Sequence, residues 1–253
     1  MNITVLGSGS KGNSTLIQIN NKKILIDVGF SYTELKKRLG KIKVDPTQID
    51  YLLITHEHND HIYGLETFVK KVKPELIIDA KLINILFTAN ENININVINE
   101  ELIVDEIMIR KIPVSHDSKV SNGFLIEYNN ESVVYLTDTG YIHQNYFKML
   151  ANKTYYIIES NHDTEMLING PYPVYLQKRI LSDKGHLSNE FCGNYLTKLI
   201  GDKTKKVILA HLSETNNDPT IALDTIMSIL KQHDIKFNDI ECAPQDEILE
   251  VHQ

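Results

Sequence analysis

Short apolar runs recur along the chain, separated by polar or glycine-containing segments. Runs rich in Val, Ile and Leu have the length of strands, and they cover residues 2–6, 15–19, 23–27, 51–55, 107–114, 133–137, 155–159 and 206–210. Amphipathic patterns and capping residues predict helices over 33–39, 62–72, 175–181, 188–200 and 219–231. This alternation indicates an α/β protein, and we expect residues 1–253 to form a single domain.

One apolar run stops at the sequence His56-Glu-His58-Asn-Asp60-His61. Three imidazoles and a carboxylate within six residues are costly to bury without a partner, and borderline-hard metals such as zinc bind this set of side chains. His56 and His58 can reach one ion, while Asp60 and His61 can reach a second. The alternative is a solvated helix start with Asn59 or Asp60 as N-cap, which accounts for one histidine but not for three.

Polar residues of the same kinds follow several other apolar strands. They are His116, Asp138, His162 and His211. Loops at the strand ends of layered α/β proteins gather at one edge, so residues far apart in sequence can converge there. A single such histidine is more often structural than a ligand, but the repetition favours a shared site. Asp27 ends the third strand and is a candidate to orient a ligand histidine, although a turn carboxylate is equally plausible.

A glycine-rich loop, Gly-Ser8-Gly-Ser10-Lys-Gly-Asn13, follows the first strand. Such a loop can bend sharply and offer backbone N–H groups to an anion, which makes Ser8, Ser10 and Asn13 candidate substrate contacts. The loop lacks the Walker lysine, and its glycines do not form GxGxxG, so a nucleotide-binding fold is disfavoured. A simple hairpin turn is about as well supported.

A second candidate substrate-binding segment interleaves aromatic and basic side chains. It contains Tyr172, Lys178, Arg179 and Lys184. Single-stranded nucleic acid is bound by aromatic rings that stack on bases and by cations that pair with phosphates. The competing interpretation is an ordinary amphipathic helix with a solvated basic face, and it is slightly favoured for each residue taken alone.

Composition narrows the partners and the cellular compartment that we expect for the protein. A formal net charge of -7 at pH 7 argues against a surface that is cationic throughout, and it suits a narrow site for nucleic-acid ends better than a long duplex-binding face. Cys192 and Cys242 cannot form a disulfide framework and lack CxxC spacing, which indicates a reducing cytosol. No apolar run approaches the ~18 residues of a membrane span, and the chain opens with a strand instead of a signal core. We expect a cytoplasmic protein without a membrane partner; the sequence leaves the oligomeric state open.

The order of the candidate ligands resembles that of the metallo-β-lactamase fold superfamily: a His-x-His-x-Asp-His motif, then a histidine, an aspartate and a late histidine at strand ends. The resemblance implies a four-layer αββα sandwich of two similar halves with a binuclear metal site along one edge. It assigns the first metal to His56, His58 and His116. It assigns the second to Asp60, His61 and His211, with Asp138 bridging the two. Zn²⁺ is the expected metal, and Mn²⁺ is an alternative.

Differences within the superfamily narrow the chemistry. Many true metallo-β-lactamases have cysteine at the position of Asp138, and flavodiiron oxidoreductases have glutamate at the position of His58, so both activities are disfavoured. Only 72 residues separate Asp138 from His211. That spacing leaves no room for the large inserted domain of the β-CASP nucleases.

Longer motifs resemble the YycJ/WalJ family of bacterial proteins, which are described as 5′→3′ DNA exonucleases. They are LGSGSKGNS at 6–14, ESNHD at 159–163, GPYP at 170–173, DKGHLSNE at 183–190 and HLSETNN at 211–217. Gly-His186-Leu-Ser also resembles the Gly-His-Ser-Thr motif of the ribonuclease Z group, whose histidine assists at the scissile phosphate. His186, at a predicted helix start, is therefore a catalytic candidate. His162 either faces the phosphate or is a satisfied loop histidine.

The residues and the resemblance together predict a binuclear metal-dependent phosphodiesterase acting on nucleic acid, with the YycJ/WalJ resemblance implying a 5′→3′ DNA exonuclease. Two metals can lower the pKa of a water molecule and clamp the oxygens of a phosphodiester. His186 would protonate the leaving oxygen, and Asp60 would bind metal and orient the attacking water. Two other functions stay open: hydrolysis of a small thioester or cyclic phosphodiester, and a regulatory role in which the metal centre serves folding.

Overall fold

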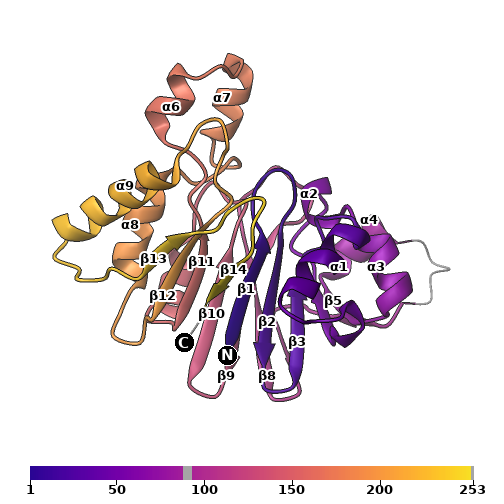
Figure 1. Ribbon diagram of the computed structural model, residues 1–253. Coiled ribbons are helices and arrows are strands. Elements are labelled where there is room, and N and C mark those ends of the chain that lie inside the picture. The colour runs from indigo at the N-terminus through magenta and orange to yellow at the C-terminus, as the bar shows by residue number, and fades with distance from the viewer. Residues whose placement is uncertain (88–92, 252–253) are drawn as a thin grey trace. The chain divides into compact units, whose positions relative to one another are not determined.

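The computed structural model describes residues 1–87 and 93–251, and the chain folds into two compact units. Unit 1 comprises residues 1–102, 118–120 and 244–253, and unit 2 comprises residues 103–117 and 121–243. Neither unit is one continuous stretch of chain. Within the described residues, the strands form two mixed sheets of seven strands each (Figure 1).

The sheet of unit 1 combines an antiparallel meander with parallel strands. Its strands are β1 (Asn2–Gly7), β2 (Ser14–Ile19), β3 (Lys22–Ile26), β4 (Tyr51–Leu53), β5 (Glu75–Ile78), β6 (Ile95–Val97) and β14 (Leu249–Val251). β1, β2 and β3 are antiparallel neighbours, and β3 to β6 follow in parallel order. β14 pairs antiparallel with β1 at the opposite edge. The helices are α1 (Tyr32–Lys41), α2 (Asn59–Ile62), α3 (Leu65–Val72) and α4 (Ala80–Leu86), with a 3-10 turn η1 (Pro46–Gln48).

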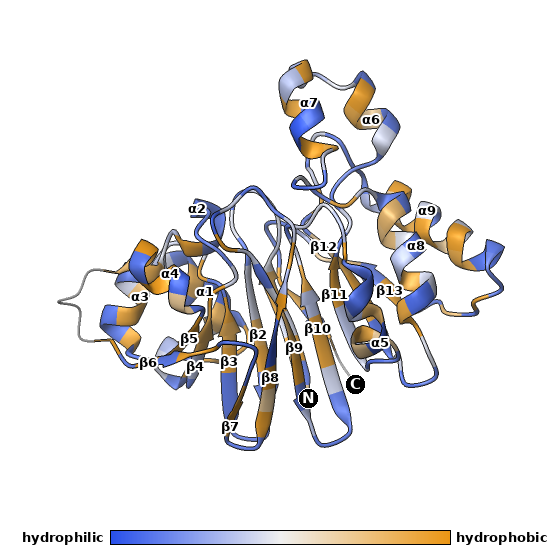
Figure 2. Cartoon of the chain, turned by 180° about the vertical axis from the view of Figure 1, so that it is seen from behind, coloured by the Kyte–Doolittle hydropathy of each residue, from blue (hydrophilic) through white to orange (hydrophobic). Residues whose placement is uncertain are grey.

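The helices of unit 1 cover one face of its sheet through a leucine-rich core. Leu16, Leu25 and Leu52 of the strands share a buried cluster with Leu39 of α1 and Phe68 of α3. Burial of large apolar side chains is the main stabilising contribution to such a layer. Figure 2 shows the apolar residues concentrated in the strands of the sheet.

The helix predicted over 62–72 is wrong in one respect, because the structure divides it into α2 and α3. Gly64 lies at the break, and its N–H donates to Val28 O at 2.8 Å. A Cβ at Gly64 would lie 2.1 Å from Phe30 O. This close backbone approach ends α2 after one turn and turns the chain before α3 begins.

Unit 2 repeats the strand pattern of unit 1. The second sheet consists of β7 (Glu101–Val104), β8 (Ile107–Pro113), β9 (Asn122–Tyr128), β10 (Glu131–Leu136), β11 (Tyr155–Glu159), β12 (Lys206–Ala210) and β13 (Ile240–Cys242), and all of it except the first two residues of β7 belongs to unit 2. β8, β9 and β10 are antiparallel neighbours, and β10 to β13 run parallel. The repeated topology agrees with the two similar halves that the resemblance implied.

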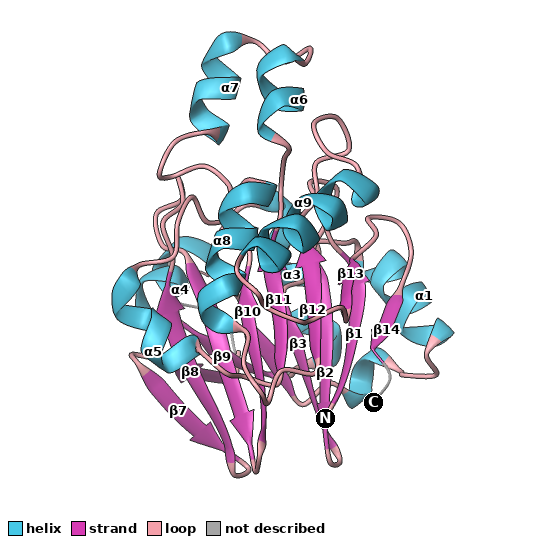
Figure 3. Cartoon of the chain, turned by 90° about the vertical axis from the view of Figure 1, so that its left-hand side faces the viewer, coloured by secondary structure: helices cyan, strands magenta, loops and turns pink. Residues whose placement is uncertain are grey.

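The helices of unit 2 fall into a packed group and a projecting pair. They are α5 (Phe147–Leu150), α6 (Thr164–Asn169), α7 (Val174–Ile180), α8 (Asn189–Leu199) and α9 (Pro219–Gln232), with a 3-10 turn η2 (Gln144–Tyr146). Leu196 of α8 and Ile226 of α9 pack on Val134 and Leu209 of the sheet. α6 and α7 extend away from this sheet (Figure 3). Among the described residues, every helix is too short or too polar to cross a membrane.

Candidate metal centre

Three residues that end strands adopt left-handed backbone conformations. Asp27 after β3, Asp138 after β10 and His211 after β12 have φ of 61°, 54° and 57°. Non-glycine residues rarely occupy this region, and such strain concentrates at functional sites. The extended backbone of each strand therefore ends at or just before these residues, which is where the sequence predicted the site.

In unit 1, a buried carboxylate orients two histidines. Asp27 Oδ2 accepts a hydrogen bond from His61 Nδ1 at 2.7 Å and one from Thr55 Oγ1 at 2.8 Å. Because Thr55 gives its only hydroxyl proton to Asp27, His56 Nδ1 must donate to Thr55 Oγ1, at 3.0 Å. Both histidines therefore present Nε2 as the ligating nitrogen. The predicted role of Asp27 as an orienting carboxylate agrees with these contacts.

His58 and Asp60 complete the cluster of unit 1. The ring of His56 lies 4.7 Å from that of His58 and 4.1 Å from that of His61, measured between centroids. Asp60 Oδ2 lies 3.6 Å from His61 Nε2. α2 has His58 at its N-cap position and no side-chain capping bond, so neither Asn59 nor Asp60 caps this helix.

The glycine-rich loop lies against this cluster, but its three candidate residues differ in exposure. Asn13 is 1% exposed and its amide bonds both Gly9 N and Gly9 O, and its Nδ2 lies 3.0 Å from His61 Nε2. Ser8 is also buried. Ser10 is exposed and lines a pocket of about 350 Å³ together with Asp60. Of the three, only Ser10 is open to a substrate.

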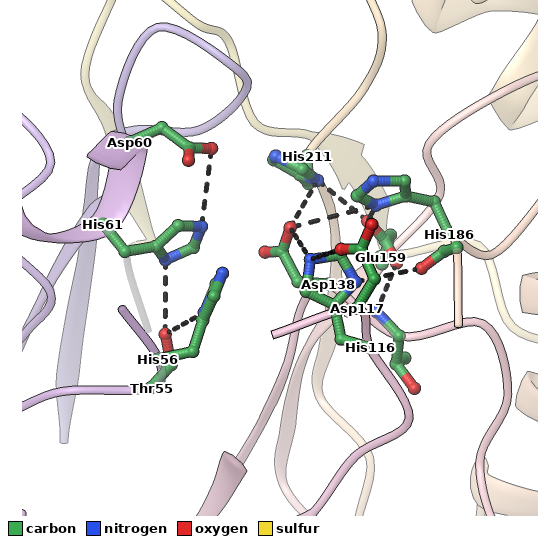
Figure 4. Close-up of polar contacts among 12 residues, drawn as sticks. Thr55, His56, Asp60, His61, His116, Asp117, Asp138, Glu159, His186 and His211 are labelled. Atoms are coloured by element: carbon green, nitrogen blue, oxygen red, sulfur yellow. Dashed lines mark hydrogen bonds and ion pairs between the residues drawn. The ribbon is translucent and has the colours of Figure 1, made fainter. Parts of the chain in front are cut away.

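In unit 2, Glu159 at the end of β11 orients two further histidines. Its Oε1 accepts from His186 Nδ1 and His211 Nδ1, both at 2.8 Å (Figure 4). Its Oε2 accepts from Thr139 N at 2.9 Å and Leu187 N at 3.2 Å. With four donors, the carboxylate is saturated, and it acts as the partner that orients both rings instead of as a ligand. The sequence motifs gave Glu159 no role; the one available signal was its position as a carboxylate at the end of the apolar strand over 155–159.

Asp138 and His116 lie beside these rings. Asp138 Oδ1 is 3.5 Å from His211 Nδ1 and 3.8 Å from His116 Nε2. His116 Nδ1 donates to Gly185 O at 3.2 Å, which again presents Nε2. The ring centroid of His186 lies 5.1 Å from that of His116 and 5.2 Å from that of His211.

The position of His186 differs from the predicted helix start. α8 begins at Asn189, with Ser188 as the N-cap whose side chain accepts from Phe191 N. His186 therefore lies before the helix. Its ring is oriented by the hydrogen bond to Glu159 and not by the dipole of the helix.

His162 is buried and lacks the local partners of a satisfied loop histidine. His162 is 1% exposed. Neither nitrogen of its ring has a hydrogen-bond partner in the part of the chain that the structure describes. Burial lowers the pKa of His162 to about 4. A buried polar group of this kind is expected to meet water or a ligand.

The basic segment of unit 2 is exposed, and one of its cations is already paired. Arg179 Nε donates to Asp117 Oδ2, and Asp117 Oδ1 lies 3.4 Å from His116 Nε2. Lys178 and Lys184 are exposed, and Tyr172 is half-buried. The segment thus runs from α7 to the loop that carries His186.

Burial and neighbouring groups shift the pKa values of several of these side chains. Burial would raise the pKa of Glu159, but the charge of His186 and hydrogen bonds from His186 and His211 outweigh it and hold the pKa at about 2. Burial lowers the pKa of His116, although Asp138 opposes the shift. In unit 1, burial raises the pKa of Asp27 against the opposing charge of His61.

The donor set fits divalent metal ions. In unit 2, one side-chain nitrogen or oxygen atom from each of Asp138, Glu159, His186 and His211 lies within 4.8 Å of the others, so the predicted ligands Asp138 and His211 lie in a dense polar cluster. Packing several imidazoles and carboxylates this closely in a buried place is costly unless a cation compensates them. Nitrogen and carboxylate oxygen donors suit Zn²⁺ and also Mn²⁺.

The chain resembles known proteins over almost its whole length. Residues 7–211 match the family model of the metallo-beta-lactamase superfamily. Exodeoxyribonuclease WalJ of Streptococcus pneumoniae strain D39 is 35% identical, over 92% of this chain and 89% of the relative. Exodeoxyribonuclease YycJ of Bacillus anthracis is 31% identical, over 92% of this chain and 90% of the relative. The crystal structure of the metallo-beta-lactamase fold protein YhfI from Bacillus subtilis aligns with a TM-score of 0.71 and 15% identity, over 99% of this chain and 98% of that one.

These matches confirm the predicted fold class. The family match includes the His-x-His-x-Asp-His motif and extends to His211, the last of the predicted ligands. The structural alignment covers both units and supports the same fold at low sequence identity. The chain belongs to the metallo-beta-lactamase superfamily.

Proposed function

We propose that this protein is a metal-dependent phosphodiesterase that removes nucleotides from the 5′ end of DNA. The main support for this proposal is that Glu159 Oε1 accepts hydrogen bonds from Nδ1 of His186 and Nδ1 of His211, both at 2.8 Å. One buried carboxylate thereby orients both imidazole rings. The names of the WalJ and YycJ relatives supply the exodeoxyribonuclease activity.

The proposed ligands are those that the superfamily resemblance implies. They are His56, His58 and His116 for one metal, Asp60, His61 and His211 for the other, and Asp138 between them. Support comes from each unit by itself: Asp27 and Thr55 fix the tautomers of His61 and His56, and Gly185 and Glu159 fix those of His116 and His211. Zn²⁺ is the first choice and Mn²⁺ the second.

Bound divalent ions would lower the pKa of a water molecule and neutralise charge on the phosphate. Asp60 would orient the attacking water. His186, held at Nδ1, would deliver a proton from Nε2 to the leaving oxygen. His162 is included as a catalytic candidate because its buried ring nitrogens have no partner among the described residues.

The proposed substrate contacts are Ser10 in unit 1 and the basic segment in unit 2. Lys178 and Lys184 are exposed cations that can pair with phosphates of single-stranded DNA. Arg179 would either break its ion pair with Asp117 to bind a phosphate oxygen or keep this ion pair, which would then hold the segment in place. Tyr172 would add a stacking surface. Ser8 and Asn13, both buried, would hold the loop that carries Ser10.

A cytosolic setting is part of the proposal. Cys192 and Cys242 are both free thiols, and burial raises the pKa of Cys242 to about 12. Thiols kept unreactive in this way suit a reducing compartment.

The activity is tested with single-stranded DNA labelled internally and blocked at the 5′ or the 3′ end. With Zn²⁺ or Mn²⁺ present, we expect shortening of the 3′-blocked strand and no shortening of the 5′-blocked one, and a chelator should abolish it. Glutathione thioesters serve as the competing substrate. Thioester turnover without DNA cleavage would reject the proposal.

Replacing His186 tests the division of roles within the site. His186→Ala should lower kcat by roughly 100- to 10,000-fold, the usual contribution of a positioned general acid, while elemental analysis finds the wild-type metal content. His233→Ala, at an exposed histidine that ends α9, is the matched control and should be unaffected. Loss of metal from His186→Ala would make His186 a ligand instead.

A further inference from the structure

A pocket in unit 2 opens beside the loop that follows β10. Its volume is about 600 Å³, and Ser115, Tyr141, His143, Asn145 and Tyr146 are among the residues that line it. This volume lies within the range of sites that bind small organic groups. None of these five residues has a role in the proposed reaction.

Hydrogen bonds fix the pocket next to proposed ligands. Ser115 directly precedes His116, and its carbonyl oxygen accepts from Gly140 N at 2.9 Å. Thr139 Oγ1 donates to Tyr141 O at 2.8 Å, and Thr139 N donates to Glu159. The loop that carries Tyr141 is therefore held by the same carboxylate that orients His186 and His211.

The lining has the chemistry of a binding surface for an uncharged ring. The centroid of the His143 ring lies 6.4 Å from those of Tyr141 and Tyr146. Tyr141 is 37% exposed, so its ring lies at the surface and not in the core. Lys, Arg, Asp and Glu are absent from the described residues that line the pocket. Asn145 and Ser115 instead offer neutral donors and acceptors, which suit the edge of a heterocycle better than a phosphate.

We infer that this pocket receives one base of the DNA strand, stacked on the ring of Tyr141, while the phosphate beside that base lies at the metal ligands. This inference rests on the proposed function and adds a subsite to it. Stacking on aromatic rings tolerates any base, so the subsite would position the strand without reading its sequence. The exposed cations Lys178 and Lys184 lie outside the pocket and would contact phosphates.

The test uses oligonucleotides that carry one abasic residue at successive positions from the 5′ end. The backbone and charge stay the same, so only the stacked base is removed. Wild-type kcat/KM should fall roughly 5- to 100-fold when the abasic residue reaches one particular position, from the usual contribution of one stacked base. Tyr141→Ala should lower kcat/KM on intact DNA by a similar factor and show no further loss with that abasic substrate.

Two further variants separate stacking from folding. Tyr141→Phe keeps the ring and should retain most of the activity. Phe191→Ala removes a 60% exposed aromatic ring outside the pocket and should match wild type. The thermal midpoints of all variants are compared to detect any loss of folding. The abasic series with the wild-type protein involves no substitution, so a folding defect cannot explain its result.

The possible outcomes keep the two proposals apart. If wild type degrades DNA with equal kcat/KM at every abasic position, or if the Tyr141→Ala and abasic losses multiply, the base subsite is wrong and the nuclease proposal stands. If wild type cleaves no DNA, the nuclease proposal fails. In that case, fluorescence anisotropy with the same oligonucleotides tests whether the pocket binds a base. Weaker binding of the oligonucleotide with one particular abasic position supports the base subsite, and equal binding of all the oligonucleotides overturns it.

Discussion

At the scale of single residues, buried carboxylates determine which nitrogen each histidine presents. Asp27 does this for His61, and Glu159 does it for His186 and His211. When a histidine donates its Nδ1 proton to a carboxylate, Nε2 is the nitrogen that faces the site, as the proposed metal ligand in His61 and His211 and as the proposed proton carrier in His186. The two units thus use the same device at the ends of β3 and β11.

Glu159→Gln tests this device. An amide keeps one oxygen, so its NH₂ group must face either the two imidazole N–H groups or the two backbone N–H groups of Thr139 and Leu187. We expect metal affinity to fall roughly 10- to 100-fold, as is usual when the partner of a ligand is lost. Competition with a fluorescent chelator measures it.

The matched control for that substitution is Glu127→Gln on β9. Glu127 forms partly exposed ion pairs with Arg110 at 2.9 Å and Lys153 at 2.8 Å. Such pairs contribute less than about 1 kcal/mol, and metal affinity should not change. Equal metal affinity in wild type and Glu159→Gln would contradict the orienting role.

Most of the site could be predicted from residue types at strand ends, and the exceptions have physical causes. Asp27, His56, Asp138 and His211 follow apolar runs that are visible in the sequence. Glu159 was missed because it belongs to its strand, and only the three-dimensional structure reveals that two distant histidines share its Oε1. Burial of Asn13 likewise depends on packing that a turn-forming composition does not reveal.

At the scale of elements, three loops of unit 1 are joined by backbone hydrogen bonds. Asn13 N donates to Asp60 O at 2.8 Å, Gly29 N donates to Asn13 O at 3.0 Å, and Val28 N donates to His61 O at 2.8 Å. These bonds fix α2, and therefore Asp60 and His61, to the loops after β1 and β3. The strands and most helices were predictable from local patterns, but this junction was not, because each bond connects segments far apart in sequence.

Gly29→Ala tests the junction. A Cβ at this position would lie 1.8 Å from Asp60 O, so the start of α2 must shift. We expect the free energy of unfolding to fall by about 1–3 kcal/mol, the usual cost of overpacking, with weaker metal binding. Gly40→Ala in α1 is the control, since its Cβ meets nothing within 4 Å, and it should add about 0.5–1 kcal/mol. Urea denaturation of both variants measures the difference; a Gly29→Ala protein as stable as wild type would contradict the junction.

At the scale of the whole molecule, the two ends of the chain meet in unit 1. β14 pairs with β1, and Ser8 N donates to Pro244 O at 3.2 Å. The sequence did not predict this pairing, because pairing across nearly the full chain has no local signature. A consequence is that the last residues support the glycine-rich loop, which carries Ser10.

Gln245→Ala should loosen that loop. Gln245 Oε1 accepts from Lys11 N at 3.1 Å, and its Nε2 donates to Gly12 O at 3.2 Å. Loss of both bonds should lower the free energy of unfolding by about 1–2 kcal/mol and speed amide hydrogen exchange at Lys11. Asp246→Ala removes only an exposed ion pair to Lys11, at 3.9 Å, and should change stability by less than about 0.5 kcal/mol. Because Asp246 and Gln245 are neighbours, similar exchange rates at Lys11 in the two variants would show that the segment as a whole, and not the Gln245 amide, supports the loop.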